Sequence, residues 1–166
     1  NTIGNVEIAS FLLEDAWLNS LERTKLDHIN LLKKHFALNI TYFLQNYPYK
    51  NYTIKTIRSN QTITMVTIDF ENNLMITPWI IKKKGRFYII DIIVKDRSFI
   101  LRKKTKFIEL LESLDNNLEK FNSKLDEMNR KASTLLYKNY DKTSTNYNRS
   151  SKKPYPFETL RHLLLL

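Results

Sequence analysis

The feature of this sequence that most restricts its fold is the segment 86–94, which is apolar on both sides of an extended strand. It contains the letters RFYIIDIIV, in which Asp91 is the one charged residue after the first position. Alternate side chains of a strand point to opposite faces of a sheet, so this strand cannot have one face in water. The sheet must therefore be covered on both faces, or covered on one while the other lines an apolar cavity.

Three further strand-like segments precede it, at about 51–58, 62–70 and 74–83. The short polar breaks between them, such as Lys84-Gly85, suit tight hairpin turns, so the sequence predicts a four-stranded antiparallel meander. Pro78 has no backbone N–H to donate to a neighbouring strand. We therefore expect the third strand to lie at an edge of the sheet or to be bulged at this proline.

Helical periodicity predicts the remaining elements. Residues 5–19 and about 20–45 form two N-terminal helices, with Ser20 as a candidate N-cap of the second. From Ser98, apolar residues recur at spacings of three and four, which predicts one long helix with a heptad seam. The seam consists of Phe107, Leu111, Leu114, Leu118, Phe121, Leu125, Met128, Ala132 and Leu135. The predicted fold class is α+β, with N-terminal helices, a curved antiparallel sheet and a long C-terminal helix.

Two regions of different composition divide the chain. Residues 1–137 carry the apolar patterning of one domain, whereas 138–155 are polar and predict a flexible extension. The apolar end, 157–166, could dock on the domain, join a partner or remain an unattached tail. No apolar stretch is long enough to span a membrane. The start at Asn1 shows no signal peptide, so we expect a processed or truncated form.

The sequence offers no recognisable active site. Only two glycines occur and no cysteine, which argues against phosphate-cradling loops, thiol nucleophiles and thiolate metal sites. His28 and His35 lie two helical turns apart, too far for one zinc ion. We expect these two and His162 at the surface or at its boundary. The prediction is no catalytic residue, no metal ligand, no cofactor and no enzymatic activity.

Charge leaves two explanations open. The net charge is +10, from 27 basic and 17 acidic residues, which fits either an anionic partner or a composition biased towards Lys, Asn and Ile. The dispersed charges favour the second explanation. The basic groups at 82–84 and 102–106 could meet a phosphate or an anionic membrane, or simply be solvated. Asp91 is expected to bond backbone groups or a basic side chain, because a buried carboxylate needs a partner.

The stretch 79–107 resembles the MlaC family, also called toluene tolerance proteins, which are periplasmic phospholipid-binding auxiliary components of an ABC transporter. In the family pattern an aromatic strand leads through a Lys/Gly turn to an Asp, an apolar strand end, a Ser and a helix Phe. Here Asp91, Val94, Ser98 and Phe107 stand at those positions. The likeness covers about residues 6–128, and the chain is similar to a divergent member without the N-terminal part of the family domain.

The resemblance implies a cone-shaped arrangement of sheet and helices around a pocket for phospholipid acyl chains. It implies a monomeric periplasmic carrier of Gram-negative bacteria that serves outer-membrane lipid asymmetry. Its partners would be an inner-membrane ABC transporter complex and an outer-membrane lipoprotein complex, with phospholipid as cargo and no nucleic acid. Asp91 and Ser98 are expected to be structural. The candidate pocket lining is Phe36, Ile40, Phe43, Val66, Ile68, Phe70, Ile76, Trp79, Ile90, Ile92, Val94, Phe107 and Leu111.

Two other functions remain open on the residues alone. The heptad seam at 107–135 would suit a coiled-coil interaction module. The basic charge would suit a nucleic-acid-binding domain, although it would need exposed aromatic residues beside the basic ones. Tyr49, Tyr52, Phe87 and Tyr88 are weak candidates for such stacking.

Overall fold

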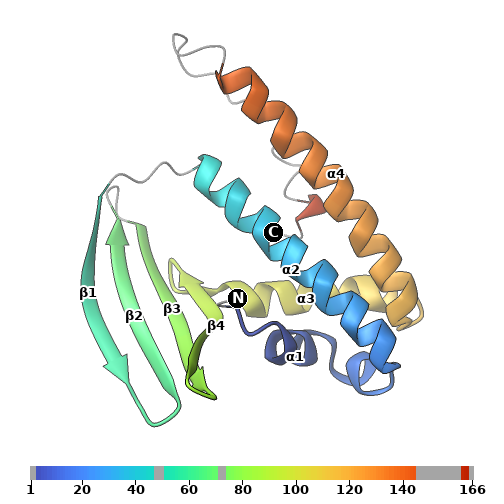
Figure 1. Cartoon of the computed structure of the whole chain (residues 1–166), viewed down its shortest axis with the longest axis horizontal. Coiled ribbons are helices and arrows are strands. Elements are labelled where there is room, and N and C mark those ends of the chain that lie inside the picture. Colours follow the sequence, from blue (N-terminus) through green and yellow to red (C-terminus); the bar gives the residue numbers. More distant parts are fainter. Residues whose placement is uncertain (1–2, 47–50, 71–73, 145–161, 165–166) are drawn as a thin grey trace.

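The computed structural model describes residues 3–46, 51–70, 74–144 and 162–164, and it shows an antiparallel sheet beside a group of helices (Figure 1). The helices are α1 (Asn5–Leu18), α2 (Glu22–Asn46), α3 (Phe99–Glu112) and α4 (Leu118–Ser144). The strands are β1 (Tyr52–Ser59), β2 (Ile63–Phe70), β3 (Leu74–Lys83), β4 (Arg86–Val94) and the short β5 (Arg97–Ser98). The predicted α+β fold class is confirmed.

The sheet is the meander that the short polar breaks predict. Its order is β1-β2-β3-β4-β5, and each neighbouring pair is antiparallel. Lys84 and Gly85, between β3 and β4, have φ angles of 49° and 75°. A two-residue hairpin turn of type I′ has positive φ at both positions, and glycine adopts such angles without strain. β5 was not predicted, because a strand of only two residues has no recognisable alternation.

Pro78 lies in an interior strand, so of the two predicted alternatives the sheet edge is wrong, and the bulge is found at the next residue. β3 pairs with β2 on one side and with β4 on the other, where Pro78 is opposite Ile92. The pairing of β3 with β4 is irregular directly after Pro78. Trp79 pairs with Asp91 while Ile80 pairs with Ile89, which leaves one extra residue in β4. Proline is tolerated inside this sheet because the ladder is already interrupted beside it.

The first two helices follow the predicted ranges closely. Glu14 has non-helical angles, φ 44° and ψ −115°, and kinks α1 before its last turn. Ser20 is not the cap of α2, contrary to the prediction. Its hydroxyl donates to the carbonyl of Ala16 at 2.6 Å, so it satisfies the end of α1 instead.

The prediction of one unbroken helix from Ser98 to Leu135 is wrong, because the chain turns between α3 and α4. Asp115 and Asn116 have φ angles of 58° and 55°. Asp and Asn tolerate this left-handed conformation better than most residues, so they can end a helix where no glycine is present. The apolar spacing continues across the turn, which is why periodicity alone did not reveal it.

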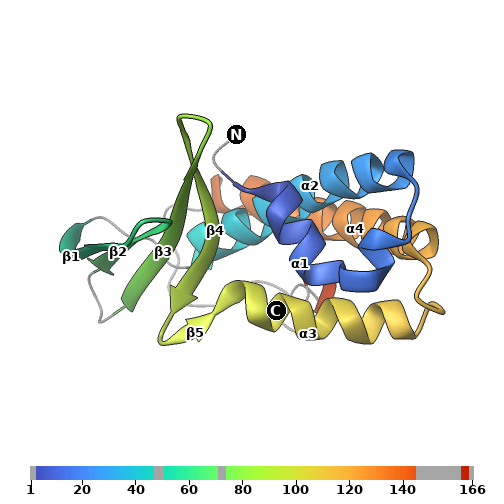
Figure 2. The same ribbon diagram turned by 90° about the horizontal axis from the view of Figure 1, so that it is seen from below.

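The second part of the seam packs within this chain. α4 runs parallel to α2, and the two helices are side by side in both views (Figures 1 and 2). Leu118, Phe121 and Leu125 are buried, as are Met128 and Ala132 further along. A buried seam is not available to a second chain, so the observation that suggested a coiled-coil interaction module no longer supports it.

The hydrophobic core lies among the helices. Its cluster is drawn from α1, α2, α3, α4 and the short C-terminal segment at 162–164. Within the described ranges, Leu74 is the one apolar strand residue that is buried, and it stands apart from this cluster. Leu163 and Leu164 are buried against the helices, so this part of the apolar end docks on the domain.

The first residues of the predicted flexible extension, 138–144, belong to α4. α4 continues to Ser144, through seven residues whose composition favours disorder. Adding residues to an existing helix costs little compared with starting one, and Leu136, which is buried, anchors the turn before them. The other residues of the predicted extension up to 161 fall outside the described ranges.

Candidate functional site

The pairing register gathers apolar side chains on one face of the sheet. Cross-strand partners point to the same side, and so do residues two apart in a regular strand. One row of partners crosses four strands as Ile54, Ile68, Ile76 and Val94. With the neighbouring rows it forms what we call the apolar sheet face: Tyr52, Ile54, Ile57, Val66, Ile68, Phe70, Leu74, Ile76, Pro78, Ile80, Ile89, Ile92 and Val94.

This face is only partly covered by the rest of the chain. Ile54 and Ile57 are 53% and 65% exposed, and the face residues of β2 and β4 are half-buried. The contacts between sheet and helices run chiefly from α1 and α3 to β4 and β5. Thirteen such residues are far more apolar surface than single scattered side chains would leave, and large exposed apolar patches mark binding sites. The opposite face is mixed, with Thr67, Asp69 and Thr77 among its residues.

Asp91 ties β4 to the start of α3. Its carboxylate accepts hydrogen bonds from the backbone N–H groups of Ile92 at 2.7 Å and Ile100 at 3.1 Å, and from the Ser98 hydroxyl at 2.6 Å. The Ser98 oxygen in turn accepts from the N–H of Leu101 at 2.9 Å and caps α3. These are the backbone partners expected of a carboxylate in an apolar strand, and they fix the helix to the sheet edge.

The thirteen candidate pocket residues fall into several groups. Six belong to the apolar sheet face: Val66, Ile68, Phe70, Ile76, Ile92 and Val94. Trp79 is on the opposite face, and Ile90 is the extra residue of the bulge in β4.

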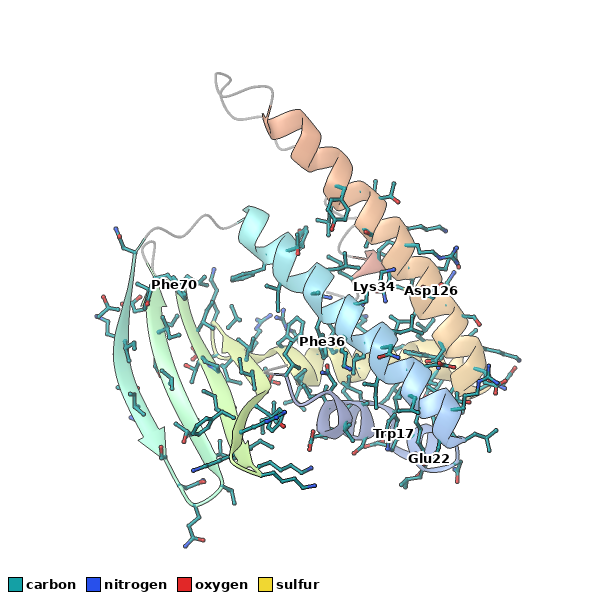
Figure 3. The ribbon with its side chains drawn as sticks, viewed as in Figure 1. Trp17, Glu22, Lys34, Phe36, Phe70 and Asp126 are labelled. Carbon is teal, nitrogen blue, oxygen red and sulfur yellow. The ribbon has the colours of Figure 1, made fainter. Side chains whose placement is uncertain are left out.

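The helical candidates divide in a similar way. Phe36, Phe107 and Leu111 are buried in the helical core. Figure 3 shows Phe36 in the middle of α2 and Phe70 at the end of β2. Ile40 is 44% exposed and Phe43 is half-buried. The candidates therefore do not form one group in space.

Sequence reasoning missed the contribution of β1. Tyr52, Ile54 and Ile57 all lie on the apolar sheet face, although Ile54 and Ile57 are three positions apart. An extra residue, Lys55, shifts the register between them, so that the alternation of faces changes within the strand. The letters YTIKTI carry the signal only if a bulge is assumed.

Two histidines are buried in the helical core, so their predicted place at the surface is wrong. His28 and His35 of α2 are each 0% exposed, whereas His162 is exposed as predicted. His28 Nδ1 lies 2.8 Å from Asn122 Oδ1, and His35 Nδ1 lies 2.9 Å from Asn129 Oδ1. Both pairs join α2 to α4, and the second repeats the first after seven residues.

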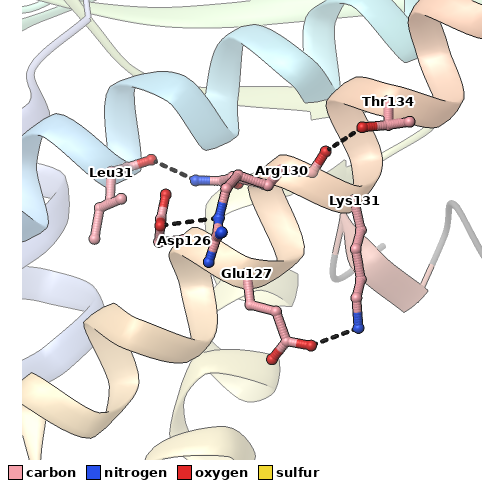
Figure 4. A network of polar contacts seen from close by, with 7 residues as sticks. Leu31, Asp126, Glu127, Arg130, Lys131 and Thr134 are labelled. Atoms are coloured by element: carbon pink, nitrogen blue, oxygen red, sulfur yellow. Dashed lines mark hydrogen bonds and ion pairs between the residues drawn. The ribbon is translucent and has the colours of Figure 1, made fainter.

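The amide nitrogens determine which ring atoms carry protons. Asn122 Nδ2 donates to the Thr24 carbonyl at 3.1 Å. Asn129 Nδ2 donates to the Leu31 carbonyl at 3.0 Å, the bond drawn at Leu31 in Figure 4. Each Oδ1 is then an acceptor, so each histidine donates from Nδ1 and leaves Nε2 as an acceptor. Neutral histidine rings are sufficient to form these hydrogen bonds. The two helices can therefore be joined by polar side chains inside an apolar core without burying a charge on either ring.

Lys103 of α3 meets the second of these pairs. The residue is 1% exposed, and its amine donates to His35 Nε2 at 3.3 Å, to Asn39 Oδ1 at 2.9 Å and to the Leu164 carbonyl. Three acceptors match the three donors of an ammonium group. We call His28, His35, Asn39, Lys103, Asn122 and Asn129 the buried polar cluster.

Burial controls the protonation of this cluster. It lowers the pKa of His28 to about 4, although the hydrogen bond that His28 donates to Asn122 acts in the opposite direction and raises it. It lowers the pKa of His35 to about 3, with the positive charge of Lys103 acting in the same direction. Burial also brings the pKa of Lys103 well below 10.5. Two surface clefts, of about 250 Å³ and about 640 Å³, are lined by residues outside the buried polar cluster.

The described ranges contain neither a cluster of metal ligands nor a helix that could span a membrane. No group of three or more His, Asp or Glu side chains there is placed to hold a metal ion. None of the helices described is long and apolar enough to cross a bilayer.

Comparison with known proteins identifies the fold. The chain is similar in structure to a phospholipid-binding protein from Ralstonia solanacearum, solved in complex with a phospholipid, with a TM-score of 0.68. The two share 14% sequence identity over 80% of this chain and 76% of that one. No protein-family model and no curated protein matches the sequence. The α+β fold is therefore the same as that of a phospholipid-binding protein, at a level of identity that shows the fold alone.

Proposed function

We propose that this chain binds phospholipid on the apolar sheet face and carries it between membranes. The observation that carries the proposal is that twelve of the thirteen side chains of one face are exposed or half-exposed, and that Leu74 is the one buried residue among them. An antiparallel sheet can leave one face in water, but that face is then polar. The shared fold with a phospholipid-binding protein supports lipid as the molecule that covers it.

The dimensions and energetics suit an acyl chain. β3 has ten residues, which at about 3.3 Å each extend for roughly 30 Å. The hydrocarbon core of a bilayer is about 30 Å thick, so the acyl chains of one leaflet extend over about half of that length. The strand is therefore long enough to cover an acyl chain. Each methylene removed from water contributes about 0.8 kcal/mol, so a pair of chains on this face binds tightly without specific polar contacts.

We further propose that the chain is an MlaC-like carrier of the periplasm. The partners would be an inner-membrane ABC transporter complex and an outer-membrane lipoprotein complex, and the process would be maintenance of outer-membrane lipid asymmetry. The bonding of Asp91 with Ser98 supports the proposal, because both residues stand at positions of the resembled pattern. Cell fractionation of the full gene product tests the compartment, and recovery with the cytoplasmic fraction would contradict it.

A charge placed on the apolar sheet face is expected to abolish lipid binding. We expect protein purified from bacteria to carry phospholipid detectable by mass spectrometry and to move labelled phospholipid between vesicles. Ile68→Lys should lose both, because a lysine amine would have to be buried under an acyl chain.

Thr67→Lys is the matched control, because Thr67 is the next residue of the same strand and points to the other face. It should fold as well as Ile68→Lys and keep its lipid. Wild-type protein that carries no lipid and takes up none, or two variants with equal binding, would contradict the proposed site.

A further inference from the structure

Positive charge is concentrated at the turn between β3 and β4. Four of the five residues 82–86 are lysine or arginine, and the fifth is Gly85. These residues are exposed, and so is Phe87, whose ring centroid lies 5.7 Å from the Lys82 amine. Figure 2 shows the turn projecting beyond the helices, on the side of the molecule away from α3. We call residues 82–87 the basic hairpin tip.

The cleft of about 250 Å³ lies beside the basic hairpin tip. The first turn of α1, the middle of α2 and the β3–β4 hairpin form it, and its charged lining residues are Lys33, Lys83, Lys84 and Glu7. Glu7 forms an ion pair with Lys83 at 2.5 Å. In the part of the chain that the structure describes, neither Lys33 nor Lys84 has a carboxylate within ion-pair distance. The cleft therefore holds two positive charges that no carboxylate offsets.

The opposite end of the sheet has a more balanced charge. Lys95 and Arg97 are both exposed there, but they stand on either side of Asp96 in the sequence. Lys55 is paired with Asp69 at 3.3 Å. Arg97 thus belongs to a mixed group of charges, whereas the basic hairpin tip contains no acidic residue.

The larger cleft, of about 640 Å³, has the opposite sign. It is lined by Glu14, Asp15 and Glu119 and by no basic residue, although the chain has a net charge of +10. The basic hairpin tip and the smaller cleft together contain five basic side chains and one acidic one. The excess positive charge is therefore not spread evenly, and a field of this kind steers anionic partners to one side of the molecule.

We propose that the basic hairpin tip docks on the surface of an anionic bilayer, with lipid phosphates against Lys33 and Lys84 in the smaller cleft and the Phe87 ring among the headgroups. Basic side chains beside an exposed apolar one suit a membrane surface, because anionic lipids attract the cations while the interface accepts the ring. A single-stranded nucleic acid would instead need several exposed rings for its bases. Phe87 is the one exposed ring of the tip, since Tyr88 is half-buried.

The docking surface is distinct from the face that holds the cargo, so the inference goes beyond the proposed function. The two nevertheless adjoin. Lys82 pairs with Phe87, and the next row on the same side of the sheet is Ile80 with Ile89, which belongs to the apolar sheet face. A docked tip would therefore bring the apolar sheet face to the bilayer from which a lipid is taken.

Vesicle flotation measures docking. Wild-type protein should bind vesicles of phosphatidylcholine mixed with phosphatidylglycerol and leave vesicles of phosphatidylcholine alone in solution. Binding should weaken as sodium chloride is raised, because salt screens exposed charges. Wild-type protein that binds neither kind of vesicle, or both equally, would overturn the docking surface.

A pair of double variants tests the position of this surface. Lys33→Gln/Lys84→Asn removes the two unpaired charges of the cleft, and asparagine tolerates the φ angle of 49° at residue 84. It should weaken binding to anionic vesicles about 25-fold, at about fivefold for each basic residue beside an anionic surface. Arg97→Gln/Arg102→Gln is the control, since it removes two exposed charges near the start of α3 and should leave binding within about twofold of wild type.

Equal losses in the two double variants would show attraction by net charge alone and would overturn the assigned surface. A single-stranded RNA that binds wild-type protein more tightly than the vesicles do, at equal phosphate concentration, would overturn the membrane as the partner. Ile68→Lys, which is expected to lose its cargo, should still bind anionic vesicles. Protein that docks but carries no phospholipid would contradict the proposed function and leave the docking surface intact.

An environment-sensitive dye tests the contact itself. The chain has no cysteine, so one dye can be attached at Phe87→Cys in the tip or at Leu101→Cys, which is 57% exposed on α3. On anionic vesicles the emission of the dye at residue 87 should shift to the blue, and that of the dye at residue 101 should not. An unshifted dye at residue 87 on bound protein, or equal shifts at both positions, would overturn the proposal.

Discussion

Acidification from pH 7 to pH 4 is expected to unfold much of this protein, because His28 and His35 must gain protons that the folded core excludes. Their pKa values in the fold are about 4 and about 3, against 6.5 in the unfolded chain. A histidine is positively charged when protonated, so a lowered pKa means that the folded state holds the neutral ring at a pH where the unfolded chain is already protonated. The unfolded state therefore binds more protons below pH 6.5, and stability falls as the pH falls from there towards 4 and 3.

The size of this effect is large in comparison with a typical folding stability. A pKa difference of 2.5 for His28 corresponds to on the order of 3 kcal/mol, at 1.36 kcal/mol per pH unit. Small domains are stable by about 5–15 kcal/mol in total. Two such histidines thus remove a large share of the stability at pH 4.

Circular dichroism as a function of pH measures this unfolding. His28→Gln should move the acid midpoint to lower pH, since one of the two proton-accepting groups is gone and an amide can still bond Asn122. His162→Gln is the control, because His162 is exposed and should leave the midpoint unchanged. A fold that persists unchanged to pH 4, or an equal shift in both variants, would contradict the prediction.

Replacement of Phe107 by alanine is expected to cost about 3–5 kcal/mol of stability, the range for a buried aromatic residue. Phe107 is 0% exposed, and its ring centroid lies 5.1 Å from that of Phe121 and 6.0 Å from that of His35. Its loss leaves a cavity at the place where α2, α3 and α4 meet. Urea denaturation gives the free energy of unfolding directly.

Phe87→Ala serves as the control for this measurement. The Phe87 side chain is 62% exposed on the sheet, so its removal should change the free energy of unfolding by less than about 1 kcal/mol. A similar loss in both variants would show that Phe107 is not a core residue. Phe107 was also a candidate for the pocket lining on sequence grounds. A large loss of stability in Phe107→Ala alone would show that its role is in the core of the fold.

Much of the fold could be predicted from alternation and spacing, because these patterns are local. The double-sided apolar character of β4 and the hairpin breaks predicted the meander correctly. The turn between α3 and α4 could not be found in this way, since Leu114 and Leu118 maintain the helical spacing across Asp115 and Asn116. Their positive φ angles depend on the packing of the helices on each side.

The candidate site was less accessible to sequence reasoning. Strand alternation correctly groups Ile68 with Phe70, but two bulges change which residues of β1 and β4 share a face. The buried polar cluster was missed for a different reason. A histidine seven residues from another is usually solvated, and only the pairing of α2 with α4 places Asn122 and Asn129 opposite the rings.

The position of Leu164 has a consequence for biosynthesis. Its carbonyl is one of the three acceptors of the Lys103 amine, and Leu163 and Leu164 fill part of the core between helices made much earlier. These contacts can form only after Leu163 and Leu164 have left the ribosome. The helical part of the protein therefore completes its packing only once the segment 162–164 has been synthesised, and a nascent chain that stops at the end of α4 would expose the place where these leucines belong.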